Sequence, residues 1–221
     1  MAIEVHTKDC TALSDAELAD MADICTEGTS GYEVGLLSKQ REEWVLVSLA
    51  RDGRKLAGFS FCTLERIGGT PCVLIGLAST KPGVRRDAVL KAVVNDQLRR
   101  AVLAFPDEDV LVGAQVNDPA AVQAFSMLED VVPRPGHRAT GEERAWGRRL
   151  AKRFGAEGRL DDRTFVLAGT GNPPCVVDHQ SVDPTAIDPD VAAFFEPLDR
   201  TRGDSLILFG WAMAEDLAKL V

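Results

Sequence analysis

The sequence predicts a mixed α+β fold in which helices flank a central β-sheet in three layers. Two segments carry this prediction. In residues 84–105 apolar side chains recur every three or four positions, as on one face of a helix, and residues 72–78 form a nearly continuous apolar run, typical of a strand covered on both faces. Hydrophobic residues make up 45% of the chain and charged residues 27%, which excludes disordered, collagen-like and coiled-coil chains.

Two helices are expected at the start of the chain. Ser14 and Glu17 form a capping box, so a helix should begin there and run to about Cys25. The glycine-containing residues 28–31 interrupt the pattern. A second, shorter helix is expected over residues 32–40.

A three-stranded meander follows these helices. Asp-Gly and Gly-Gly dipeptides mark tight turns at residues 52–53 and 68–69. They separate three strand-like segments, at residues 44–51, 55–66 and 72–78.

The long helix at residues 84–105 is followed by a strand and another helix. Residues 110–116 form an apolar, strand-like run. Asp118 is a good N-cap and Pro119 suits the first helical position, so the next helix should run from there to about Glu129.

The last third of the chain has weaker local signals. Arg163–Ala168 and Cys175–Asp178 are strand-like, and residues 205–220 are interpreted as a terminal helix, although their start, Leu206–Phe209, also suits a strand. Helices are expected at residues 142–154 and 189–195.

The charges are unevenly distributed. The net charge is −9 and the pI about 4.9, yet residues 1–80, 81–160 and 161–221 carry net charges of −5, +3 and −7. The acidic balance argues against broad nucleic-acid or anionic-membrane binding. The N-terminus lacks a signal-peptide pattern and no apolar run is long enough to span a bilayer, so a cytoplasmic protein is expected.

The five cysteines form neither a CxxC pair nor a cluster with histidine. A structural zinc site and a disulfide scaffold are therefore not expected, and no metal is predicted. Cys62 and Cys72 lie in strand-like apolar segments, where a thiol usually packs as a small hydrophobic side chain.

Basic residues gather at the start of the helix at residues 84–105. Helix N-termini carry partial positive charge, so Lys81, Arg85 and Arg86 are unfavourably placed there unless an anion lies among them, and Asp87 offsets them only in part. A strand, loop and helix N-terminus together suit a phosphate group. The alternative is that these side chains extend into solvent.

From about Glu4 to Val132 the chain resembles the GNAT superfamily of acyl-CoA-dependent N-acyltransferases. The resemblance is in element order: two helices, a three-stranded meander, a long helix, a strand and a short helix. It implies a GNAT-like fold with a mixed, splayed central sheet flanked by helices. Residues 1–135 would form the acyl-CoA-binding core, and residues 136–221 an α+β extension that completes or covers the sheet.

The resemblance also implies a cofactor site. In this family the loop after the third meander strand follows the pattern Q/R-x-x-G-x-G/A, which residues 85–90 match at Arg85, whereas Ala88 and Leu90 replace the expected small residues. The implied cofactor is acetyl-CoA or another acyl-CoA, its thioester lying along unpaired N–H groups near Leu77 and Ala78. The implied contacts are Leu77, Ala78, Ser79, Lys81, Val84, Arg85, Arg86, Asp87, Ala88, Val89, Asp118, Ala121 and Phe125.

A second family motif resembles residues 118–125. There the family often has a Tyr that donates a proton to the departing thiolate, and Phe125 occupies that position. Tyr32, the only tyrosine, falls where the family often builds its acceptor pocket. Glu33 and Glu65 are candidate general bases by location. For all three, an ordinary structural or surface role is the alternative.

Two functions follow. The first is an N-acyltransferase that moves an acetyl or acyl group from a coenzyme A thioester to an unidentified amine. The second is a catalytically inactive GNAT-like scaffold that acts as a binding or assembly module, suggested by Ala88, Leu90 and Phe125. The basic helix at residues 142–154 is interpreted as a solvated amphipathic helix, with an anionic partner as the alternative. The long acidic tail leaves room for a homodimer.

Overall fold

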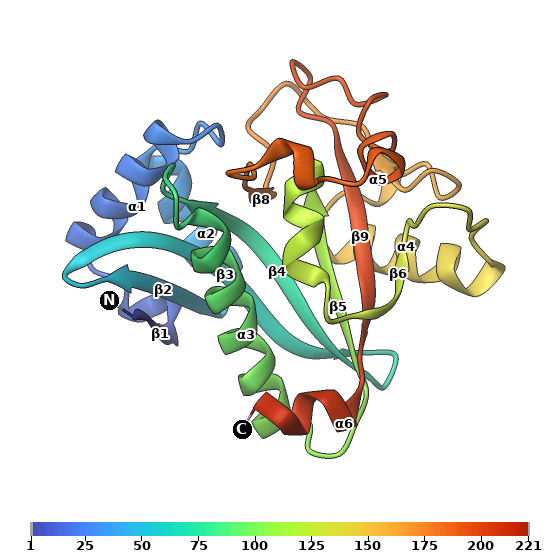
Figure 1. Cartoon of the computed structure of the whole chain (residues 1–221), viewed down its shortest axis with the longest axis horizontal. Helices are drawn as coiled ribbons and strands as arrows, with labels where there is room; N and C mark the ends of the chain where they lie inside the picture. Colours follow the sequence, from blue (N-terminus) through green and yellow to red (C-terminus); the bar gives the residue numbers. More distant parts are fainter. Residues whose placement is uncertain (1, 221) are drawn as a thin grey trace.

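Residues 2–220 are described by the structure, a computed structural model built around one nine-stranded mixed sheet (Figure 1). The strand order is β1-β2-β3-β4-β8-β5-β9-β6, and β7 also pairs with β9. One face of the sheet is covered by α1, α2 and α4, and the other by α3 with the short helices η2, α5 and α6. This three-layer arrangement confirms the predicted α+β class.

The chain begins with a strand that the sequence analysis did not predict. β1 (Ile3–Asp9) pairs antiparallel with β2 along its whole length and forms an edge of the sheet. A short helix, η1 (Cys10–Ala12), leads into α1 (Asp15–Glu27), and α2 (Val34–Glu43) follows. The capping box of α1 is confirmed, with Ser14 and Glu17 each bonding the other's backbone N–H.

The predicted meander is confirmed as β2 (Leu46–Asp52), β3 (Lys55–Ile67) and β4 (Thr70–Thr80), paired antiparallel in order. α3 (Arg86–Ala104) then crosses the sheet and buries the predicted apolar face, including Val89, Val93 and Leu98. β5 (Val110–Val116) runs parallel to β4 and is buried throughout.

After β5 the structure departs from the sequence prediction. Instead of a helix to Glu129, residues Pro119–Phe125 form a 3-10 helix, η2, and Glu129–Val132 form strand β6. Residues 129 and 132 pair with β9, and this tertiary pairing outweighs local helix propensity. α4 (Gly141–Arg153) follows as predicted, and η3 (Glu157–Arg159) lies just beyond it.

The predicted terminal helix over residues 205–220 is wrong for its first half. Ser205–Ala212 form β9, which pairs antiparallel with β5, and its alternate side chains enter the cores on opposite faces of the sheet. Such two-sided burial gives a continuous apolar run that sequence alone does not assign to helix or strand. The remaining elements are short: β7 (Val166–Leu167), β8 (Val177–Asp178), η4 (Pro184–Ala186), α5 (Pro189–Ala192), α6 (Ala214–Leu217) and η5 (Ala218–Leu220).

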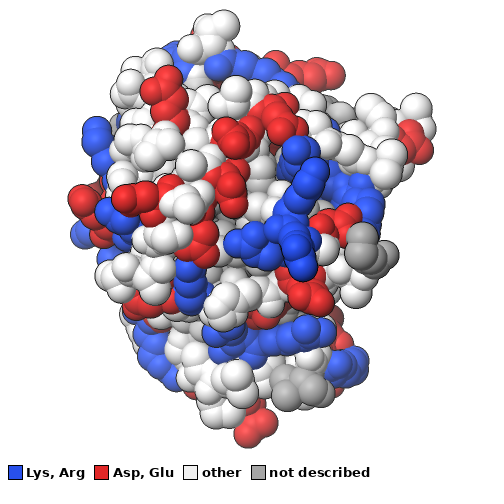
Figure 2. Space-filling model, turned by 90° about the vertical axis from the view of Figure 1, so that its left-hand side faces the viewer, with Lys and Arg blue, Asp and Glu red and all other residues white. Residues whose placement is uncertain are grey.

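The surface is electrostatically mixed where Figure 2 shows it, with Lys and Arg side chains lying among Asp and Glu. On α4, Arg148 pairs with Asp162, Arg153 pairs with Glu65, and the Arg149 guanidinium lies 4.7 Å from the Trp146 ring centroid. Several basic side chains of α4 therefore have partners within the chain. Between residues 2 and 220, no helix is long and apolar enough to cross a membrane.

Candidate functional site

The region of interest is the interval between β4 and β5. The two parallel strands pair directly only from Cys72–Ile75 to Leu111–Ala114. Beyond this stretch β8 lies between them, with Val177 in register with both Ala78 and Val116. The splayed part of the sheet is therefore filled by a strand from the C-terminal extension.

The backbone of β4 is hydrogen-bonded at this point. The N–H of Ala78 donates to the carbonyl of Val176 at 3.1 Å, and Ser79 is paired with Asp178 in the parallel register. An unpaired N–H was expected near Leu77 and Ala78. At Ala78 this expectation is wrong, because β8 satisfies the N–H within the chain.

Asp178 anchors the inserted strand. Its side chain is buried and accepts hydrogen bonds from the Ser30 N–H at 2.9 Å, the Ser79 hydroxyl at 3.1 Å, and both the N–H and the hydroxyl of Thr29. Hydrogen bonds to a carboxylate are stronger than those between neutral groups. One side chain thus ties β8 to β4 and to the loop after α1.

His179 fastens the next residues to the start of α3. Its Nδ1 lies 2.9 Å from the Thr80 hydroxyl, and its Nε2 lies 2.7 Å from Asp87 Oδ1. Burial lowers the pKa of His179 below its usual value, while the hydrogen bond with Asp87 acts in the opposite direction. The other Asp87 oxygen accepts the N–H of Val182 at 3.4 Å. We call residues 176–182 the inserted segment.

Two of the three basic residues at the same helix start form ion pairs within the chain. Lys81 Nζ lies 2.9 Å from Glu27, and Arg85 Nη1 lies 2.6 Å from Asp52. The Nε of Arg86 is buried and has no hydrogen-bond partner among residues 2–220. Of the positive charge predicted to attract an anion, the part on Lys81 and Arg85 is therefore paired with carboxylates from other elements.

The other predicted cofactor contacts lie around this interval. Leu77 packs against the helices of the α1 face, whereas Val89, Ala121 and Phe125 are buried on the α3 face. Two more, Val84 and Ala88, are exposed. The Asp118 carboxylate caps η2 by accepting the Ala120 N–H at 2.9 Å.

The three predicted catalytic side chains have different surroundings. Tyr32 is buried, which raises the pKa of its phenol, and its hydroxyl donates to the carbonyl of Pro173 at 3.3 Å. Glu33 is exposed at the N-cap position of α2 without a capping hydrogen bond. Glu65 accepts two hydrogen bonds from Arg153. Their catalytic roles stay predictions.

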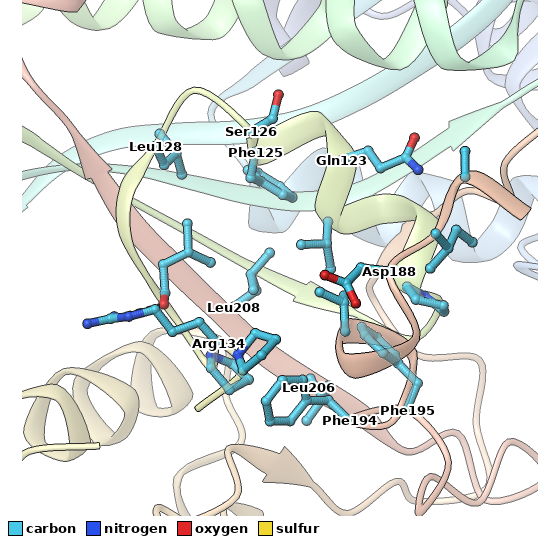
Figure 3. A pocket seen from close by; sticks show the side chains of 18 residues that line it. Gln123, Phe125, Ser126, Leu128, Arg134, Asp188, Phe194, Phe195, Leu206 and Leu208 are labelled. Carbon is cyan, nitrogen blue, oxygen red and sulfur yellow. Dashed lines mark hydrogen bonds between the residues drawn. The ribbon is translucent and has the colours of Figure 1, made fainter. Parts of the chain in front are cut away.

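Two cavities on the α3 face border the inserted segment and the chain that follows it. One, of about 290 Å³, lies between α3 and η2 and is lined in part by Ala88, Ala124 and His179. The other, of about 360 Å³, lies between η2, β6, α5 and β9 (Figure 3). Its walls are mostly apolar, including Phe125 and Phe194. β8 thus fills the β4–β5 interval, and the chain after β8 contributes to the walls of both cavities.

Sequence analysis missed Asp178 and His179 as members of this site. The strand-like residues 175–178 were recognised, but nothing local indicates that they pair between β4 and β5. The one sequence signal that singles them out is an aspartate at the end of a short strand-like segment, followed directly by a histidine, in an otherwise acidic tail. The described residues hold no group of three or more His, Cys, Asp or Glu side chains arranged to bind a metal ion.

Similarity to known proteins is found at the level of solved structures. No protein-family model matches the chain, and no curated protein matches it in sequence. Among solved structures it is similar to the ribosomal-protein-S18-alanine N-acetyltransferase from Escherichia coli, at 10% identity over 95% of each chain with a TM-score of 0.46. It is also similar to aminoglycoside 6'-acetyltransferase type Ii, at 12% identity over 59% of this chain and 86% of that one, with a TM-score of 0.43.

A third similar structure is the NatC complex bound to Gag peptide and CoA, at 15% identity over 57% of this chain and 82% of that one, with a TM-score of 0.42. The order of elements from α1 to η2 is the order that the GNAT resemblance implies. The mixed sheet with helices on both faces is the α+β architecture that the sequence predicts.

Proposed function

We propose that this chain is a GNAT-like binding module whose cofactor cleft is closed by its own inserted segment, and that it does not transfer acyl groups. In this proposal residues 1–135 form the GNAT-like core and residues 136–221 the extension that closes it. The observation that carries the proposal is the position of β8 between β4 and β5, with Ala78 N–H bonded to Val176.

An acyl-CoA does not fit these residues as they are folded. A thioester polarised by β4 needs an N–H donor aimed at its carbonyl oxygen, and Ala78 already donates within the chain. A phosphate group at the start of α3 would compete with the carboxylates of Glu27 and Asp52 for Lys81 and Arg85. We therefore derive no catalytic step through this cofactor.

Residue identity supports the same proposal. Ala88 and Leu90 add side chains where the family motif has small residues, and Phe125 has no proton to donate to a departing thiolate. Phe125 is buried in the apolar core of the α3 face. The residues that differ from the family motifs and the inserted segment are thus two independent obstacles to a cofactor at the same site.

An N-acyltransferase that uses acyl-CoA and an unidentified amine is the second candidate. The cavity of about 290 Å³ between α3 and η2 favours it, because this cavity adjoins the helix start at which the family holds its cofactor. The candidate requires the inserted segment to leave the β4–β5 interval. That movement would break the contacts of Asp178 and His179.

Calorimetric titration with CoA and with acetyl-CoA separates the two candidates. For the binding module we expect no saturable binding at about 1 mM, a concentration that detects even weak complexes. The double variant Asp178→Ala/His179→Ala, which loosens the inserted segment, should also release no CoA from acetyl-CoA when amines are supplied. Asp183→Ala is the matched control, because Asp183 is exposed and bonds locally to Thr185. Saturable binding to the unaltered chain, or turnover by the double variant, would refute the proposal.

A further inference from the structure

A cavity of about 450 Å³ lies on the other side of the sheet, between the C-terminal ends of α2 and α4. Its lining includes Glu43 and Trp44 from the end of α2, Glu65 from β3, and Arg153 and Phe154 from the end of α4. Cys175, the residue before the inserted segment, lines this cavity, but the anchors Asp178 and His179 do not.

Two aromatic rings line the cavity. The ring centroids of Trp44 and Phe154 are 6.3 Å apart and their planes are tilted by 42°. A cation in the cavity can therefore lie within about 6 Å of both centroids, the range over which an aromatic face attracts positive charge. Trp44 also packs over β4 at Gly76, where an added Cβ atom would lie 2.3 Å from the indole ring. Because Gly76 has no side chain, β4 leaves space for the Trp44 ring at this position.

The charges of the cavity favour a cation. Glu43, Glu65 and Arg153 give its lining a net charge of −1. Both Glu65 oxygens are taken by Arg153, whereas no basic side chain within residues 2–220 forms an ion pair with Glu43. The two helices also end here, and helix C-termini carry partial negative charge.

A buried amide holds the charged and aromatic groups in place. Gln40 is only 7% exposed, and its Nε2 donates to Glu43 Oε2 at 2.9 Å. Its Oε1 accepts the Trp44 indole N–H at 3.0 Å and the Cys175 thiol at 3.1 Å. The Gln40 side chain therefore orients both the Glu43 carboxylate and the Trp44 indole, as expected of a preorganised site.

Several hydrogen-bond acceptors of the cavity are already engaged within the chain. A primary ammonium group donates three hydrogen bonds and would compete for them. Arg153 occupies Glu65, Gln40 occupies one oxygen of Glu43, and the Gln115 carbonyl oxygen lies 3.1 Å from the Ser205 hydroxyl. A fully methylated ammonium needs no acceptor and is stabilised by negative charge and aromatic faces alone.

We propose that this cavity binds an organic cation with a quaternary ammonium group, which lies against Trp44 and Phe154 near the Glu43 carboxylate. A quaternary nitrogen has no lone pair and cannot be acylated. The inference therefore goes beyond the proposed function and does not depend on whether the β4–β5 interval admits a cofactor.

Three probes of similar size test the proposal by calorimetry on the full chain: choline, its primary-amine analogue ethanolamine, and its uncharged isostere 3,3-dimethylbutan-1-ol. Choline should bind at least about tenfold more tightly than either analogue, because only choline combines charge with methyl groups. It should also shift the Trp44 indole N–H resonance in an NMR spectrum. Equal binding of the uncharged isostere or of ethanolamine would overturn the proposal, as would no saturable choline binding at about 50 mM.

Side-chain variants locate the site. Glu43→Gln should weaken choline binding about fivefold or more, and Trp44→Ala should weaken it about tenfold or more. The matched control is Glu42→Gln, which removes a neighbouring exposed carboxylate that does not line the cavity. Because Trp44→Ala can disturb folding, Glu43→Gln decides the result. Identical choline binding by Glu43→Gln and Glu42→Gln would refute the assignment.

Discussion

Replacing Asp178 with alanine should loosen the inserted segment. The change removes the acceptor of hydrogen bonds from Ser30, Ser79 and Thr29. We count only the Ser30 and Ser79 donors, because Thr29 is partly exposed and can bond to water instead. At about 1.5–3 kcal/mol for each hydrogen bond to a charged group, the lost free energy is at least about 3 kcal/mol.

Hydrogen exchange of the Ala78 amide measures this loss directly, because that amide donates to Val176 in the inserted segment. A loss of about 3 kcal/mol should speed its exchange about 100-fold or more, at tenfold for each 1.4 kcal/mol. The midpoint of thermal unfolding should fall by about 6–12 °C if the segment unfolds together with the rest of the chain.

Asp183→Ala is again the control and should leave the Ala78 amide unchanged. An increase of less than about threefold in Asp178→Ala would contradict the reasoning, because it would mean that the carboxylate contributes under about 1 kcal/mol.

Three further predictions concern stability. Burial lowers the pKa of His179 below the value of about 6.5 that it has when unfolded, so the unfolded chain binds the extra proton more readily. The contribution of neutral His179 to stability should therefore be complete above about pH 6.5 and be lost as the pH falls toward the folded-state pKa. Urea unfolding between about pH 7.5 and pH 5, roughly the range of histidine titration, should show this loss in the unaltered chain but not in His179→Gln. Parallel pH profiles of the two proteins would contradict the prediction. Gly76→Ala should cost about 2–3 kcal/mol of unfolding free energy and weaken choline binding, because the new methyl group collides with Trp44; a stability unchanged within about 0.5 kcal/mol would count against the packing described. Ser14→Ala, which removes the capping box of α1, should cost about 1 kcal/mol in the same unfolding assay, and a gain in stability would oppose it.

Elements with local signals were the ones predicted correctly from sequence. The capping box at Ser14 fixes the start of α1, and the repeating apolar face of α3 is visible within one window of residues. β1 and β9 were missed or misassigned because each is stabilised by pairing with a strand far away in the chain. Ser205–Ala212 is apolar on both faces, so its periodicity does not distinguish a strand from a helix.

The same difference between local signals and long-range contacts explains which features of the candidate site could be predicted from sequence. The excess of basic residues at the start of α3 is readable from sequence, and an anion was expected to balance it. The structure supplies Asp52, 33 positions from Arg85, and Glu27, 54 positions from Lys81. No spacing rule links residues so far apart. The closure of the β4–β5 interval by β8 is hidden for the same reason, because it depends on a strand pairing of only two residues.

The proposed closure of the β4–β5 interval to a cofactor is tested most directly by a crystal structure of the chain grown with acetyl-CoA at about 5 mM, well above the dissociation constants usual for cofactors. The account predicts that Val177 still lies between Ala78 and Val116, with the Ala78 N–H bonded to Val176 and no coenzyme between β4 and β5. Electron density for the coenzyme between these two strands, with residues 176–182 displaced, would contradict it.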